Sequence, residues 1–180
     1  MTASTAGCGA TGADMSVTAN ILESWRAPRK VMRRLLAGGL REDRALMFLM
    51  GGCFVIFMAQ WPRLARLAHE TDEVPLQAML GGALLGWLFI APLFLYGLAA
   101  ALRLLMVALR RPIGWFEARL ALFWSLMAAS PLWLLNGFLN GVVGPGLVTG
   151  IIGMGILAAF FWLLAQMLAT AALEARAGNT

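Results

Sequence analysis

LQAMLGGALLGWLFIAPLFLYGLAAAL, residues 76–102, is the stretch that decides the fold. Gln77 and Tyr96 are its only strongly polar members over 27 residues. About 20 apolar residues in an α-helix cross the hydrocarbon core of a bilayer, so this stretch is long enough to span a membrane. The composition agrees, because 61% of the chain is apolar and 13% is charged, against about 25% charged in soluble domains. The sequence therefore predicts an all-α, polytopic helical membrane protein.

Further apolar stretches bring the predicted number of membrane spans to four. The last apolar run begins at Gly141 and would measure about 50 Å as one straight helix, which is longer than a bilayer core is thick. The Gly-Pro-Gly turn at 144–146 is therefore expected to precede the final helix. Residues 104–109 are bracketed by arginines and are expected to extend the second helix along the interface. One transmembrane domain over 41–173 results, with spans at 45–61, 76–102, 120–139 and 147–173.

The basic residues predict how these spans are oriented. Counted on alternate sides of the four spans, the connecting segments hold twelve Arg and Lys against two. By the positive-inside rule, both termini, including the tail at 174–180, are expected to be cytoplasmic. The Arg-, Ala- and Leu-rich composition is typical of a GC-rich bacterial genome, so the expected location is the bacterial inner membrane. Basic residues that flank apolar runs are expected to meet anionic lipid headgroups rather than nucleic acid.

The N-terminal region divides into two parts. Residues 1–15 are small and polar, which predicts a disordered tail or a mis-called start codon and excludes a secretory signal peptide. Residues 16–40 form a basic amphipathic segment, in which Pro28 favours two short helices and Gly38-Gly39 ends the second. We expect this segment to lie in the membrane interface, and the alternative is recognition by a partner protein. Its membrane-surface residues are Arg26, Arg29, Lys30, Arg33 and Arg34.

The chain offers few residues for chemistry. The predicted spans contain no Asp or Glu, which disfavours proton- or ion-coupled transport. The only histidine, His69, stands in the sequence HETDE, whose spacing matches no zinc motif, so a solvated acidic loop is expected. Ser125 and Ser130 lack a nucleophile motif and a base, and Cys8 and Cys53 form no Cys-x-x-Cys pair. We therefore predict no catalytic residue, no cofactor and no metal site.

Polar and small residues inside the spans are expected to pack helices against one another. Asn136 and Asn140 share a helix face and Gln166 lies on the last helix, where amides hydrogen-bond between helices. The alternative is that these amides line a polar ligand site. Glycines four residues apart allow close helix approach, within the monomer, in a homo-oligomer or in a larger membrane complex. These glycine pairs are Gly82 and Gly86, Gly137 and Gly141, and Gly146 and Gly150.

Five stretches together resemble the bacterial branch of the Yip family, whose members are small polytopic proteins related to eukaryotic Ypt/Rab-interacting membrane proteins. They are SWRAPRKVMRRLL, RALMFLMGGC, QWPRLARLAH, GWLFIAPLFLYGLAAALRLL and RLALFWSLMAASPLWLL. The resemblance covers about residues 16–173 and rests on the hydropathy layout and on Pro, Gly and Arg positions. Eukaryotic members act in vesicle trafficking and bind prenylated small GTPases. This chain lacks their acidic N-terminal region and DLYGP-like motif and has four predicted spans instead of five, so GTPase binding is not implied.

These observations together favour a protein without enzymatic activity. We expect a membrane organiser or adaptor that acts through helix–helix contacts and through lipid contacts of the basic amphipathic segment. One alternative is an accessory subunit of a larger respiratory or photosynthetic complex. Another is a small transporter or lipid-handling protein, for which Asn136, Asn140 and Gln166 would line the polar path.

Overall fold

The computed structural model describes residues 17–39, 41–70, 75–111, 113–144 and 146–177. The predicted tail at 1–15 lies outside these residues. Within the described ranges the chain is helical and contains no strand. Four helical stretches are long and apolar enough to cross a membrane, which confirms the predicted all-α, multi-pass fold class. These stretches are Glu42–Glu70, Leu76–Ala108, Trp115–Val142 and Leu147–Ala177.

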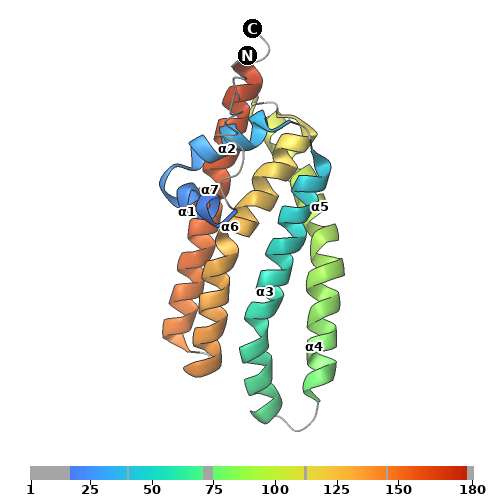
Figure 1. Cartoon of the computed structure of the whole chain (residues 1–180), viewed down its shortest axis with the longest axis vertical. Helices are drawn as coiled ribbons and strands as arrows, with labels where there is room; N and C mark the ends of the chain where they lie inside the picture. Colours follow the sequence, from blue (N-terminus) through green and yellow to red (C-terminus); the bar gives the residue numbers. More distant parts are fainter. Residues whose placement is uncertain (1–16, 40, 71–74, 112, 145, 178–180) are drawn as a thin grey trace, which may run out of the picture.

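The four long helical stretches run up and down the long axis of the molecule, and the short helices α1 and α2 lie beside its upper half (Figure 1). In chain order they are α1 (Val17–Arg26), α2 (Pro28–Ala37), α3 (Glu42–Glu70), α4 (Leu76–Leu85), the π-helical turn η1 (Gly86–Ile90), α5 (Ala91–Ala108), α6 (Trp115–Val142) and α7 (Leu147–Ala177). We call the end that carries α2 and the C-terminal turns of α7 the terminal end. The opposite end, where α3 finishes and α7 starts, is the loop end.

Helix α6 occupies the centre of the bundle and packs against α3, α5 and α7. Phe123 and Trp124, in the N-terminal half of α6, are fully buried. The ring of Phe48 from α3 meets Trp124 edge-on, with ring centroids 4.7 Å apart, and Tyr96 from α5 meets Phe123 at 5.1 Å. These aromatic contacts join three spans around one core at the terminal half of the bundle.

Two prolines in the spans each remove one backbone N–H donor from a helix, and the structure compensates for each loss nearby. Pro92 cannot donate a helical hydrogen bond, and the turn before it widens so that the N–H of Ala91 donates to the carbonyl of Gly86. Pro131 leaves the Met127 carbonyl without its usual donor. The hydroxyl of Ser130 donates to that carbonyl instead, at 2.9 Å. Ser130 therefore has a structural role in α6.

The amphipathic segment forms two helices, as Pro28 predicts, and α2 ends at Ala37 before the glycine pair. The surroundings of this segment differ from the membrane interface that the sequence predicts. Helix α2 lies against α7, and Val31, Met32 and Leu35 are buried in the common core. The reason is that α7 continues to Ala177 and so supplies a surface for α2. The apolar face assigned to the membrane interface is thus largely covered by the protein itself.

Candidate membrane-surface site

A basic groove lies where α1, α2 and α7 meet at the terminal end. Its volume is about 550 Å³. Helix α1 gives way to α2 at Ala27, whose non-helical backbone (φ −140°, ψ 64°) turns the chain and brings basic side chains from both helices to one side. Its lining residues are Arg26, Ala27, Pro28, Arg29, Lys30, Arg33, Trp162 and Gln166.

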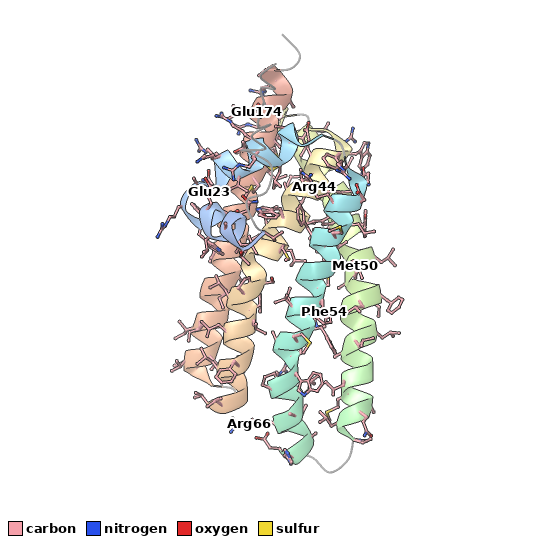
Figure 2. The ribbon with its side chains drawn as sticks, in the orientation of Figure 1. Glu23, Arg44, Met50, Phe54, Arg66 and Glu174 are labelled. Atoms are coloured by element: carbon pink, nitrogen blue, oxygen red, sulfur yellow. The ribbon has the colours of Figure 1, made fainter. Side chains whose placement is uncertain are left out.

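Two contacts hold the basic side of α2 against α7. The guanidinium of Arg29 donates through Nε to Oε1 of Gln166 at 3.1 Å. One turn further along α2, Arg33 Nε pairs with Oε1 of Glu174 at 2.9 Å. Figure 2 shows Glu174 on α7 beside α2 at the terminal end. Gln166 therefore supports the N-terminal segment, a role that spacing along the sequence does not indicate.

Glu23 connects α1 to α2. Its carboxylate pairs with Lys30 Nζ and with Arg34 Nη1, each at 2.9 Å. The hydrogen bond from Lys30, followed by that from Arg34, lowers the pKa of the Glu23 carboxyl below its ordinary value of 4.5. The carboxylate therefore stays ionised and keeps the two helices folded against each other at neutral pH.

The ion pairs leave part of the basic charge uncompensated. Lys30 and Arg34 share Glu23, and Arg33 has Glu174. Among the described residues no carboxylate pairs with Arg26 or Arg29. Five cations facing two carboxylates leave three positive charges on this surface. Guanidinium groups bind phosphate oxygens through parallel hydrogen bonds, so the groove can hold an anionic phosphate group.

The contact between α1 and α6 was not anticipated from the sequence. Ser24 is fully buried, and its hydroxyl accepts a hydrogen bond from Trp124 Nε1 at 2.9 Å. Trp25 Nε1 donates to the Ala128 carbonyl at 3.3 Å. The sequence carried one signal for this contact. It is a serine at an otherwise apolar position of an amphipathic helix, together with a tryptophan in the third span. These bonds place α1 on the side of α6.

The glycine pairs differ sharply in their surroundings. A Cβ at Gly137 would collide with the Ala59 carbonyl oxygen, and one at Gly141 with the Pro62 ring, so this pair brings α6 and α3 into contact. The other predicted packing glycines have open space around them in the described part of the chain. These are Gly82, Gly86, Gly146 and Gly150.

The predicted packing amides do not form one cluster. Asn140 Nδ2 donates to the backbone carbonyl of Asn136 within α6, and no described residue bonds to Asn136 Oδ1. Asn136 Nδ2 lies toward Gly153 of α7. Gln166 is thirteen residues further along α7, or about 20 Å by helical rise. The asparagines therefore belong to the loop end and Gln166 to the basic groove.

The loop beside His69 is described only in part, because residues 71–74, which include the last three residues of the sequence HETDE, lie outside the described residues. Glu70 pairs with Arg66 Nε at 3.0 Å. Arg66 Nη1 also donates to the last carbonyls of α6, at 3.3 Å to Gly141 and 3.4 Å to Val142. The described residues contain no group of three potential metal ligands. Figure 2 shows Arg66 at the loop end.

The fold and the groove define the chain as a multi-pass helical membrane protein with a basic surface at its terminal end. Comparison with family models, curated proteins and solved structures finds no match.

Proposed function

We propose that this chain is a non-enzymatic, Yip-like protein of the bacterial inner membrane that organises the membrane around it as an adaptor. Anionic lipid headgroups are its partners on the cytoplasmic leaflet, and helix–helix contacts join it to other membrane proteins. The observation that carries the proposal is the basic groove, where Arg26 and Arg29 stand without a carboxylate partner in the described structure.

The groove suits a lipid headgroup for three reasons. Its cations Arg26, Arg29, Lys30 and Arg33 are exposed, so a headgroup phosphate can reach them from the surface. Trp162 lies in the same lining, and tryptophan favours the level of the headgroups in a bilayer. Leu22 of α1 is 70% exposed, which leaves apolar surface for the adjacent acyl chains. Each basic residue near an anionic membrane surface contributes about 1 kcal/mol of attraction.

The test measures lipid selection by the purified full-length protein in nanodiscs that contain phosphatidylglycerol and phosphatidylcholine. The wild-type protein should enrich phosphatidylglycerol around itself, and the enrichment should fall with added salt. The variant Arg26→Gln/Arg29→Gln should lose most of it. Arg111→Gln, a change of charge at an exposed residue outside the groove, is the matched control. Equal enrichment in all three proteins would refute the headgroup role.

The orientation of the protein is tested separately by reporter fusions. A fusion at residue 70 should report the periplasm, whereas a fusion after residue 176 should report the cytoplasm. The twelve-to-two division of basic residues motivates this expectation. Reports from the same side at both positions would overturn the proposed topology.

A second candidate is an accessory subunit of a larger respiratory or photosynthetic membrane complex. The observation that favours it is the second span, Leu76–Ala108, where only 6% of an apolar 18-residue stretch is buried inside the described structure. Such a surface suits contact with other helices as well as with lipid. Purification in mild detergent followed by mass spectrometry distinguishes the candidates, because a stoichiometric large complex would favour the accessory role.

A further inference from the structure

A second pocket lies at the loop end, between α3 and α6. Its volume is about 250 Å³, below the roughly 300–1,000 Å³ of sites for drug-sized ligands. Four of its eight lining residues carry an amide or a guanidinium, although six of the eight lie within the predicted spans. Its lining residues are Ile56, Ala59, Gln60 and Arg63 from α3, and Trp133, Asn136, Gly137 and Asn140 from α6.

Asn136 is the most deeply buried polar residue of this pocket. The residue is only 8% exposed, and its Oδ1 atom has no hydrogen-bond partner in the described structure. Buried polar atoms in proteins are nearly always hydrogen-bonded, and within a bilayer lipid tails offer no substitute. The unpaired carbonyl oxygen of this amide therefore points to a partner that donates a hydrogen bond.

Two further polar side chains of the pocket are also available. Gln60 and Arg63 form no side-chain hydrogen bond or ion pair with any described residue, whereas neighbouring Arg66 is engaged by Glu70. The pocket lining contains no carboxylate. One guanidinium and three neutral amides thus belong to the residues that line the same small space, the third amide being that of Asn140, whose Nδ2 already donates to the Asn136 backbone carbonyl.

We infer that this pocket binds the phosphoethanolamine headgroup of a phospholipid in the leaflet at the loop end. The phosphate of that headgroup accepts hydrogen bonds from the guanidinium of Arg63. Its primary ammonium donates to amide oxygens, first of all to the unpaired Oδ1 of Asn136. The ammonium needs no carboxylate in the pocket, because the phosphate of the same headgroup balances its charge.

This inference goes beyond the proposed function, because it concerns the other end of the bundle and a zwitterionic lipid. The pocket volume equals roughly eight water molecules at about 30 Å³ each, which suits a headgroup and excludes whole acyl chains. The acyl chains would lie outside the pocket, against apolar side chains of the spans.

The experiment compares two lipids whose headgroups differ by three N-methyl groups, which replace the N–H donors of the ammonium. Purified full-length protein in detergent is titrated with phosphatidylethanolamine or phosphatidylcholine of identical acyl chains, and bound lipid is counted by native mass spectrometry. Phosphatidylcholine carries the same phosphate, but its trimethylammonium group has no N–H. We expect the wild-type protein to prefer phosphatidylethanolamine by about 3- to 10-fold, the effect of one hydrogen bond. Equal binding of the two lipids would overturn the inference.

Variants test which residue binds the ammonium of the headgroup and which binds its phosphate. Asn136→Leu should abolish the preference, whereas Arg63→Gln should weaken both lipids alike, since both carry the phosphate. Arg63 is exposed, so its variant tests the site even where Asn136→Leu does not fold. The matched controls are Gln77→Leu, an exposed amide near the loop end, and Arg111→Gln, and both should bind as the wild type does. An Arg63→Gln protein with unchanged binding would also contradict the inference.

Free phosphoethanolamine separates a lipid from a soluble ligand of the same chemistry. It should compete weakly with phosphatidylethanolamine, because it lacks the acyl chains that hold a lipid beside the pocket. Free phosphoethanolamine that binds as tightly as the lipid would overturn the assignment to a phospholipid.

Discussion

The substitution Gly137→Ala tests the contact between α3 and α6. Gly137 lies where the backbones of these helices meet, and an added methyl group would strike the carbonyl oxygen of Ala59. A backbone oxygen has no alternative rotamer, so the helices themselves must move apart. Gly155, in the interior of α7, has open space around it in the described structure and provides the matched control.

The expected magnitudes follow from two opposing effects. Overpacking typically costs about 1–3 kcal/mol, and we take about 3 kcal/mol because the atom struck is backbone. Alanine favours a helix interior over glycine by about 1 kcal/mol. Gly137→Ala should therefore lower the free energy of unfolding by about 2 kcal/mol, while Gly155→Ala should raise it by about 1 kcal/mol.

The assay is reversible unfolding of the purified full-length protein in mixed micelles with increasing sodium dodecyl sulfate, followed by circular dichroism. The two alanine variants should shift the unfolding midpoint in opposite directions. A Gly137→Ala protein as stable as the wild type, beside the expected gain for Gly155→Ala, would refute the argument that the backbones are in contact there.

Ser24→Ala should lower the thermal stability of the detergent-solubilised protein by about 1–3 kcal/mol, because the buried indole N–H of Trp124 loses its acceptor; an unchanged melting temperature would contradict this. The lowered pKa of Glu23 means that its ion pair with Lys30 stabilises the fold above the ordinary pKa of 4.5 and is lost as the pH falls through the lowered pKa. Hydrogen exchange in α1 should increase over that acidic range in the wild type, and Glu23→Gln should lack the increase. Arg66→Met removes the side chain that donates to the last carbonyls of α6, and it should lower the free energy of unfolding by about 0.5–1.5 kcal/mol in a melting experiment. A more stable variant would show that these hydrogen bonds do not stabilise the fold.

The sequence was sufficient to predict the helices themselves. Long apolar stretches define membrane spans by length alone, since the bilayer core has a fixed thickness. Pro28 and the glycines after α2 mark the bounds of the amphipathic helices, and the Gly-Pro-Gly turn correctly places the start of α7 at Leu147. These signals are local, so they can be interpreted without knowledge of neighbouring helices.

What covers each helix face was not predictable from spacing. Gly82 and Gly86 have the same separation as Gly137 and Gly141, yet only the second pair meets another backbone. Lipid tails are as apolar as leucine, so composition does not distinguish a face that meets lipid from one that meets protein. The same ambiguity affected α2, whose apolar side chains suit a membrane interface and α7 equally well.

The docking of α2 on α7 has a consequence for biosynthesis. Arg29 and its partner Gln166 are 137 residues apart in the chain. At about 5–20 residues per second, ribosomes make the intervening chain in roughly 7 to 30 s. The amphipathic segment is therefore made long before its binding surface on α7 exists, so the apolar face that α7 covers in the final fold must first be covered by something else. The contact between α2 and α7 is completed only after the last helix has been made.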